Sequence, residues 1–178
     1  MSNVAGCSKE RTVVVNASNT ATINDVEVID ASENNTITVL VSGEGDYEFA
    51  LNNPNRLYQE SNVFENVRPG IYTVFVRDIN GCGITEEIVS VIGFPKFFTP
   101  NGDSQNDFWQ VKGISSQFQP DTVIYIFDRY GKLLTQLDPI GSGWDGNYIG
   151  SPMPTDDYWF SVTLQDGRQF SSHFTLKR

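Results

Sequence analysis

Short runs in which every second residue is apolar are the feature of this sequence that most constrains its fold. Tyr158 to Leu164 alternate in this way, and Phe170 to Leu176 largely repeat the pattern. Because successive side chains of a β-strand point to opposite faces, each run would bury one face and expose the other. The pair Asp166-Gly167 between the two runs is typical of a tight turn. The sequence therefore predicts a β-hairpin in its last part.

The same pattern extends through the rest of the chain. Thr36 to Val41, Tyr47 to Leu51 and Tyr72 to Arg77 alternate or are apolar throughout, and clusters of Gly, Pro, Asn and Asp separate them. Thr122 to Phe127 is apolar on both faces, as expected for a central strand. Turn signals recur about every 8 to 12 residues, and we find no helical period. These features predict an all-β fold.

Length and one interruption predict a division into two domains. A chain of 178 residues is long for one small sandwich and sufficient for two of about 90 residues each. Gly and Pro interrupt the strand pattern at Ile92-Gly93-Phe94-Pro95. We therefore expect two tandem immunoglobulin-like β-sandwich domains, one over residues 1–92 and one over residues 93–178.

Two internal similarities support a repeated architecture. Residues 6–13 resemble residues 81–88 at an offset of 75 residues, and both segments begin with Gly-Cys. By this comparison, residues 1–12 would be the end of a preceding repeat. Tyr72 and Tyr158 each open a half-buried strand. In immunoglobulin-like sandwiches a tyrosine at such a corner donates a hydrogen bond to a backbone carbonyl.

Charge and hydropathy exclude several classes of function. The formal net charge is -10, and phosphate backbones or anionic membranes need clustered Lys and Arg, so we expect no nucleic-acid partner. No stretch approaches the roughly 20 apolar residues of a membrane-spanning helix, so no transmembrane segment is expected. Met1 to Thr12 lack the apolar core of a signal peptide. The chain would then be either a cytoplasmic protein or the tail of a longer secreted protein.

Few residues could carry catalysis. The single histidine, His173, would lie on the strand face opposite Phe174, in solvent and without a nucleophile beside it. One His and two distant Cys cannot supply the four ligands of a zinc site. Asp156 and Asp157 would point to opposite faces of a strand, which favours turn capping over an acid/base pair. We therefore expect no enzymatic activity and no required cofactor.

The two cysteines occupy equivalent positions of the two Gly-Cys segments. Cys7 and Cys82 could be free thiols or could pair, because a disulfide is chemically allowed outside the cell. Pairing requires that their Cα atoms come within about 7 Å, which the sequence does not determine. If residues 1–12 belong to a preceding repeat, the natural partner of Cys7 would lie in that repeat.

Oxygen-bearing side chains alternate in the loop that follows Pro100. Asn101, Asp103, Gln105 and Asp107 have the spacing by which a tight loop surrounds calcium. The loop is not an EF-hand, because the twelfth position is Lys112 where a bidentate Glu would be needed. The alternative is a turn in which Asn and Asp bond their own backbone. The turn is the favoured interpretation, and calcium remains a candidate ligand.

The three tryptophans allow two interpretations. Trp109, Trp144 and Trp159 could form a platform on which sugars stack, or they could pack in the core, which is the more frequent use of Trp in a small sandwich. Alternation places Trp159 opposite Phe160, and therefore in solvent. Exposed aromatic residues tend to mark partner sites.

Several motifs in the second half occur in an order that resembles a known family. The motifs are Phe97-Phe98-Thr99-Pro100-Asn101-Gly102-Asp103, Asn106-Asp107, Ile126-Phe127-Asp128-Arg129-Tyr130-Gly131-Lys132, Gly143-Trp144-Asp145-Gly146, Pro154-Thr155-Asp156-Asp157-Tyr158-Trp159-Phe160 and Phe174-Thr175-Leu176-Lys177-Arg178. In this order they resemble the type B sorting domain of the bacterial type IX secretion system, also called the gliding motility-associated C-terminal domain. The resemblance covers Phe94 to Arg178. Ser104 departs from it, because the family more often has Gly there.

The resemblance implies an exported protein and a recognition surface. The protein would be secreted or located at the cell surface, as the tail of a longer precursor, and its partners would be the outer-membrane type IX translocon and associated barrel proteins. We expect the surface that they recognise to combine aromatic and charged residues near the chain end. Its candidates are Trp144, Asp145, Gly146, Asp156, Asp157, Trp159, Lys177 and Arg178.

The first half is similar to the immunoglobulin-like repeats of large surface adhesins. The similarity rests on Gly45 to Phe49, on Tyr58-Gln59 and on the run from Gly70 to Cys82. It implies a structural repeat beside the sorting domain. An adhesion or carbohydrate-binding β-sandwich module is the alternative function.

Overall fold

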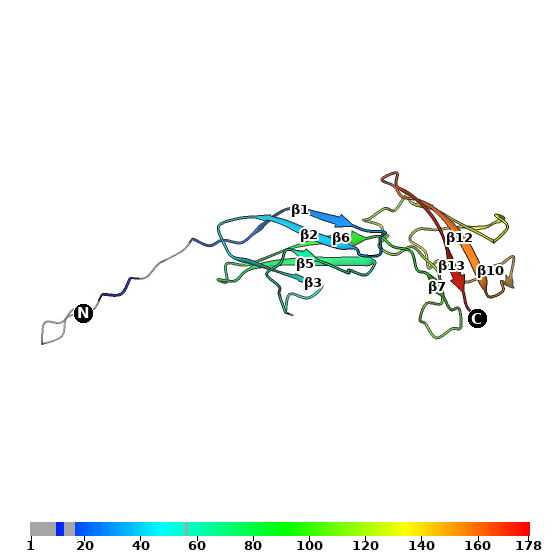
Figure 1. The fold of residues 1–178 in the computed structure, drawn as a ribbon, viewed down its shortest axis with the longest axis horizontal. Coiled ribbons are helices and arrows are strands. Elements are labelled where there is room, and N and C mark those ends of the chain that lie inside the picture. Colours follow the sequence, from blue (N-terminus) through cyan, green and yellow to red (C-terminus); the bar gives the residue numbers. More distant parts are fainter. Residues whose placement is uncertain (1–9, 13–16, 56) are drawn as a thin grey trace, which may run out of the picture.

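The computed structural model describes residues 10–12, 17–55 and 57–178. Every regular element in these ranges is a β-strand, so the predicted all-β fold class is confirmed. Figure 1 shows two groups of strands that lie end to end, and we call them the N-terminal half and the C-terminal half. The part of the chain that the structure describes has no helix long and apolar enough to cross a membrane.

Two three-stranded sheets form the N-terminal half. One consists, in order, of β1 (Thr22–Ile29), β2 (Thr36–Ser42) and β4 (Val63–Phe64). The other consists of β3 (Tyr47–Leu51), β5 (Gly70–Asp78) and β6 (Ile84–Val91). All neighbouring strands are antiparallel. Apolar side chains of both sheets, among them the fully buried Ile37 and Val74, share one core.

A five-stranded sheet organises the C-terminal half. Its strands, in order, are β7 (Phe97–Phe98), β13 (Gln169–Leu176), β12 (Asp156–Thr163), β8 (Val123–Phe127) and β9 (Leu133–Leu137). Only β7 and β13 are parallel neighbours. A small hairpin of β10 (Asn147–Tyr148) and β11 (Ser151–Pro152) lies apart from this sheet. The hairpin predicted over the last part of the chain is confirmed, with Tyr158 opposite Phe174.

Aromatic rings cover the inner face of the five-stranded sheet. Trp109 and Trp144 join two extended segments by a pair of backbone hydrogen bonds, each 2.9 Å long. The Trp109 ring stacks on Phe174 of β13 with 4.3 Å between ring centroids, and it also contacts Phe160 of β12. These extended segments, and not a further regular sheet, pack on this face of β12 and β13. A second core, separate from that of the N-terminal half, results.

Both predicted tyrosine hydrogen bonds are present. The hydroxyl of Tyr72 donates to the carbonyl of Arg68 over 2.7 Å, and that of Tyr158 donates to the carbonyl of Pro154 over 2.8 Å. Each bond spans four residues and fixes the chain where it enters a long strand. The entry of the chain into β12, beside the predicted recognition residues, is fixed in this way.

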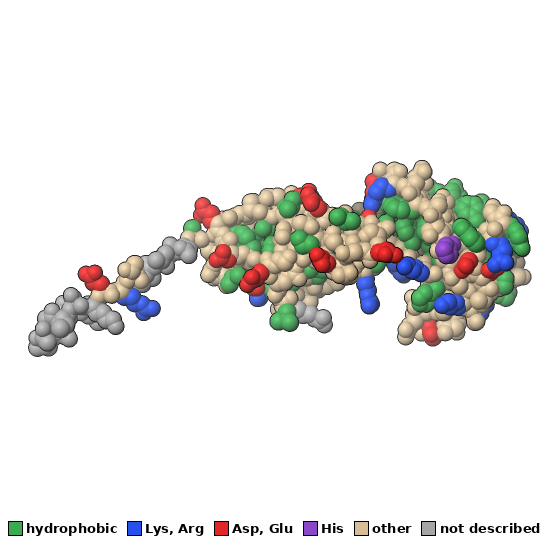
Figure 2. Space-filling model, viewed as in Figure 1, with side chains coloured by type: hydrophobic (Ala, Val, Ile, Leu, Met, Phe, Trp, Pro, Cys, Tyr) green, Lys and Arg blue, Asp and Glu red, His purple; other side chains and the backbone are tan. Residues whose placement is uncertain are grey.

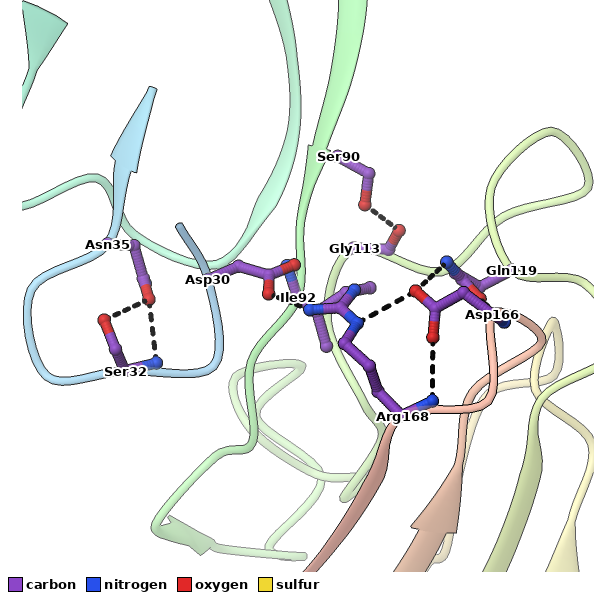
Figure 3. A network of polar contacts seen from close by, with 9 residues as sticks. All are labelled: Asp30, Ser32, Asn35, Ser90, Ile92, Gly113, Gln119, Asp166 and Arg168. Atoms are coloured by element: carbon purple, nitrogen blue, oxygen red, sulfur yellow. Dashed lines mark hydrogen bonds and ion pairs between the residues drawn. The ribbon is translucent and has the colours of Figure 1, made fainter. Parts of the chain in front are cut away.

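Hydrogen bonds hold the connection between the two halves. Gly93 and Lys112 exchange bonds of 3.2 and 2.9 Å, and the amide of Ala31 donates to the carbonyl of Ile92 over 2.9 Å. The Ser90 hydroxyl donates to the carbonyl of Gly113. The segment that leaves β6 is therefore held from both sides, as Figure 3 shows for Ser90 and Ile92.

One ion pair links the turn between β12 and β13 to the N-terminal half. The guanidinium of Arg168 contacts Asp30, whose side chain is only 5% exposed and also accepts a 3.0 Å bond from the Ile92 amide. Asp166 accepts a 2.9 Å bond from Arg168 and another from Gln119 (Figure 3). Burial lowers the pKa of Arg168, but its hydrogen bonds and charge interactions with Asp30 and Asp166 raise it on balance. The arginine therefore stays charged in the junction.

The junction yields a prediction about stability. Because Asp30 is buried and Arg168 is half exposed, their coupling should exceed the value of about 0 to 1 kcal/mol typical of surface pairs. In a double-mutant cycle with Arg168→Met and Asp30→Asn, urea unfolding of the whole chain should give a coupling energy of about 1 to 2 kcal/mol. Strictly additive effects would show that this contact does not stabilise the junction.

Candidate functional site

The predicted recognition residues gather at one end of the C-terminal half. Figure 1 shows that β13 ends there beside β7, close to the β10–β11 hairpin and to the start of β12. Hydrogen bonds tie the last residues to β7: the Thr175 amide donates to the carbonyl of Lys96 and the Lys177 amide donates to that of Phe98. The ammonium of Lys177 lies 4.9 Å from the centroid of the Phe97 ring. The chain end is thus part of the sheet.

Arg178 closes this end of the molecule. Its guanidinium donates to the carbonyls of Met153 and Gly146, each over 3.1 Å, and its amide donates to the Thr155 hydroxyl over 3.0 Å. Gly146 is buried and has a φ of 79°, in the left-handed region that favours glycine. A Cβ there would lie 2.7 Å from a methyl carbon of Leu176. Glycine at this position therefore allows the close approach of the terminal strand.

The side chain of Trp144, a candidate recognition residue, is buried. Its side chain is 3% exposed, and its ring contacts Phe98 and Tyr158 with centroid distances of 5.6 and 4.9 Å. The indole N–H donates to the carbonyl of Asn147 over 2.8 Å. Trp144 was a candidate for the recognised surface, but its burial leaves the ring no direct contact with a partner. Its role is to support the turn that follows it.

Asp145 is exposed and organises that turn. One carboxylate oxygen accepts a 2.9 Å bond from the Asn147 amide, and the other accepts a 2.7 Å bond from the Asn147 side chain. The ring of Tyr148 beyond the turn lies 4.5 Å from the ammonium of Lys132, measured from the ring centroid. The turn therefore presents one carboxylate and one aromatic–cation pair.

The two adjacent carboxylates at the start of β12 have different partners. Asp156 pairs with Arg129, while Asp157 accepts a 2.7 Å bond from the hydroxyl of Thr175 on β13. Both side chains are partly buried. They hold the loop after β8 and the end of β13 in place, and they do not face each other as an acid/base pair would.

Trp159 is exposed, as alternation predicted, with 40% of its surface in solvent. On the outer face of the sheet it lies between Phe127 of β8 and His173 of β13, its cross-strand partners. The centroids of Trp159 and His173 are 6.0 Å apart, and His173 is exposed. Since Trp109 and Trp144 are buried, the three tryptophans do not form a sugar-stacking platform.

Three neighbours of this surface were not among the predicted residues. Phe97 is 45% exposed beside Lys177, Phe127 lies next to Trp159, and Arg129 pairs with Asp156. Alternation could have identified Phe97 and Phe127, because each directly precedes or follows a buried apolar residue of its strand. The contact of Arg129 depends on how the loop after β8 folds back, which has no signal in the sequence.

The polar groups of the loop from Asn101 to Asp107 form hydrogen bonds with one another. Asp107 accepts hydrogen bonds of 2.7 to 2.9 Å from the amides of Asn101, Gly102 and Ser104. Bonds from the Asn101 side chain and the Gln105 amide lower the pKa of Asp103 below its ordinary value, against a smaller opposite effect of burial. These contacts favour the turn interpretation over the calcium interpretation. No group of three His, Cys, Asp or Glu residues able to hold a metal occurs in the described ranges.

The backbone conformation at Ser104 explains why the family more often has Gly at this position. Its φ is 66°, in the left-handed region where a side chain is unfavourable and glycine is not. The Gly that the family more often has at this position would adopt this conformation without strain.

Of the two cysteines, the structure describes Cys82. Cys82 is exposed in the turn after β5, where its amide donates a 3.1 Å bond to Asp78. Cys7 lies outside the described residues, so the bridge between Cys7 and Cys82 stays a prediction.

Comparisons with known proteins identify the C-terminal half. Residues 92–176 match the family described as "CHU_C Type IX secretion signal domain". No curated protein matches the chain.

Solved structures similar to the chain are larger proteins. A biofilm-associated protein, BSP domain, is 12% identical, with a TM-score of 0.30 over 87% of this chain and 29% of its own. SGBP-B of the Bacteroides ovatus mixed-linkage glucan utilization locus, in complex with a mixed-linkage heptasaccharide, is 14% identical, with a TM-score of 0.25 over 84% of this chain and 42% of its own. The chain thus spans less than half the length of these two structures.

The packing of the chain end predicts that substitution of two glycines destabilises the protein to different extents. Gly146 and Gly150 have φ values of 79° and 73°, so Ala at either position should lose roughly 1 to 2 kcal/mol through backbone strain. Only Gly146→Ala also forces a Cβ against Leu176, and overpacking should add about 1 to 3 kcal/mol. Thermal unfolding of both variants measures the difference. Equal destabilisation would contradict the proposed packing of the terminal strand.

The loop geometry predicts how the chain responds to calcium. Asp107→Ala should destabilise the chain by about 1 to 2 kcal/mol, because three backbone amides lose their acceptor. Millimolar calcium should leave the melting temperature of the wild-type chain unchanged, and Ser104→Gly, as a control within the loop, should not destabilise it. A rise in melting temperature with calcium that Asp107→Ala abolishes would restore the calcium interpretation.

Proposed function

Because residues 92–176 are a type IX secretion signal domain, we propose that the C-terminal half is the address by which outer-membrane type IX machinery recognises this protein. The protein is therefore an exported one, secreted or located at the cell surface. The observation that carries the proposal is the family match, together with a chain end that is folded into the sheet. A folded end offers the machinery a fixed shape.

We propose that the recognised surface consists of the exposed members of the predicted set and their neighbours. Trp159 and the charged side chains of Asp145, Lys177 and Arg178 are accessible at the same end of the sheet. Exposed aromatic residues with charged neighbours are the common composition of binding hot spots. Asp156 and Asp157 act on this surface by fixing the loop after β8 and the end of β13.

We further propose that residues 1–92 and 93–178 are separate immunoglobulin-like domains, the first of which is a structural repeat. Two separate apolar cores support this division. Both tyrosine hydrogen bonds, at equivalent places near the starts of β5 and β12, also support it. The side chain of Ile92 packs in the core of the C-terminal half, which supports a boundary near this residue.

A role in recognition, and not in catalysis, also fits the chemistry of the site. His173 faces solvent beside Trp159, and the adjacent carboxylates are engaged by Arg129 and Thr175. Neither arrangement places a base next to a nucleophile, as hydrolytic sites require. We propose that the chain acts without a cofactor, and that the Asn101–Asp107 loop serves structure alone.

An export assay tests the proposal. A reporter with an inner-membrane signal peptide is fused ahead of the whole chain and expressed in cells with and without a functional type IX translocon. We expect the reporter at the surface or in the medium only in competent cells. Retention in competent cells, or equal export in both strains, would contradict the function as a sorting signal.

Substitutions then test the surface. Deleting Phe174 to Arg178 would remove core residues, so Trp159→Ser with Lys177→Glu is the sharper variant. We expect it to fold normally by circular dichroism and to reduce export at least tenfold. Ile140→Ser, which changes a 55% exposed side chain elsewhere, is the matched control. Unchanged export of the double variant would exclude this end of the sheet as the recognised surface.

A further inference from the structure

A groove of about 640 Å³ lies between the two halves, beside residues 170–173 of β13. Its volume is within the range of known ligand sites, and such sites often occur between domains. Segments of both halves line it: the turn after β1, the loop before β5, the connection from Gly93 to Lys96, and the stretch of β13 from Phe170 to His173.

One side of this groove is an open sheet edge. β12 pairs with β13 along its whole length, whereas β7 pairs with the opposite edge only at Thr175 and Leu176. The Thr175 amide points toward β7, since it donates to Lys96. In an antiparallel pair this direction alternates, so the amides and carbonyls of Ser171 and His173 also point away from β12. Within the described ranges, no strand meets them there.

The walls of the groove are apolar inside and cationic at the rim. Phe94 and Phe170 are half buried, with ring centroids 5.1 Å apart. Arg68 and Lys96 are exposed, and Glu33 is the one acidic residue among those that line the groove. Of the 22 acidic residues of the chain, 13 precede residue 93, and Figure 2 shows acidic side chains spread over the visible face of the N-terminal half. Arg68 and Lys96 therefore give this groove more positive than negative charge on a chain that is acidic overall.

We propose that the groove binds an extended acidic peptide segment of a partner protein, which adds to β13 as a further strand. The amides of Ser171 and His173 would donate to peptide carbonyls, and their carbonyls would accept from peptide amides. Apolar side chains on one face of the peptide meet Phe94 and Phe170, while acidic side chains meet Arg68 and Lys96. Strand addition of this kind takes its affinity from the backbone and its specificity from alternate side chains.

This site and the sorting surface use different surfaces of the sheet. The groove uses the open backbone edge at Ser171 and His173, whereas the sorting surface uses the outer face at Trp159, next to the His173 ring, and the chain end at Arg178. Loss of peptide binding should therefore leave export unchanged, and loss of export should leave peptide binding unchanged.

Hydrogen exchange on the whole chain tests the strand directly. The probe is a synthetic peptide with capped ends and the sequence of Thr22–Ile29, in which Asp and Glu alternate with Val. On addition of millimolar peptide, NMR-detected exchange should slow at least tenfold at Ser171 and His173. It should change little at Phe170 and Ser172, whose amides already bond to β12. Unchanged exchange at Ser171 and His173 would overturn the proposal.

Two peptide controls separate backbone pairing from charge. A peptide with N-methyl groups on alternate amides cannot pair along one edge, and one with Lys in place of Asp and Glu has the wrong charge. We expect each to bind at least tenfold more weakly by fluorescence anisotropy. Equal binding of the N-methylated peptide would show a purely electrostatic contact and would overturn strand addition.

Two variants of one residue complete the test. Ser171→Pro removes the amide that points into the groove but no bond to β12, and proline is tolerated on such an edge. Ser171→Ala keeps the amide and removes only the hydroxyl. We expect at least tenfold weaker binding for Ser171→Pro and unchanged binding for Ser171→Ala, with both melting temperatures measured. Equal affinity of a folded Ser171→Pro would contradict the role of this edge.

Discussion

The packing of β13 determines most of the C-terminal half. Its inner residues Phe174 and Leu176 are fully buried, and Phe174 contacts aromatic rings from β7, β12 and the two segments that carry Trp109 and Trp144. Burying each such side chain contributes about 1.5 to 3 kcal/mol. The last strand of the chain therefore cannot loosen without opening the core. The candidate recognition residues attached to it therefore keep fixed positions, which a flexible tail would not provide.

This dependence explains why the candidate surface contains both buried and exposed members of one motif set. In the Gly143 to Gly146 motif, Trp144 fills the core, Asp145 shapes a turn in solvent, and Gly146 lets Leu176 and Arg178 approach. A motif that marks a family can thus contain residues needed for packing as well as residues that contact a partner. The resemblance correctly indicated the family, but it could not separate residues that contact a partner from residues that support them.

The sequence determined the strands better than the layers. Period-two alternation identified the β12–β13 hairpin, the exposure of Trp159 and both tyrosine corners, because each depends on neighbours within a few residues. It could not place Trp144 or Arg129, since both lie outside regular strands and their partners are distant in sequence. The covering of the inner sheet face by extended segments was missed for the same reason. The turn interpretation of the Asn101–Asp107 loop followed from local side-chain chemistry alone.

The two ends of β13 differ in how their backbone groups are satisfied, and the junction maintains that difference. At the chain end, β7 pairs with the edge of β13, and the amides of Thr175 and Lys177 donate to the carbonyls of Lys96 and Phe98. At the other end, Arg168 and Asp30 attach the hairpin turn to the N-terminal half, which lies alongside the edge at Ser171 and His173 without pairing with it. An unprotected edge invites unspecific pairing, and proteins usually cover or charge it. Here the N-terminal half covers part of the edge and leaves a groove with a cationic rim. In the proposed complex, the Arg168–Asp30 contact that aligns the two halves therefore also limits which peptide segments can reach the open edge of β13.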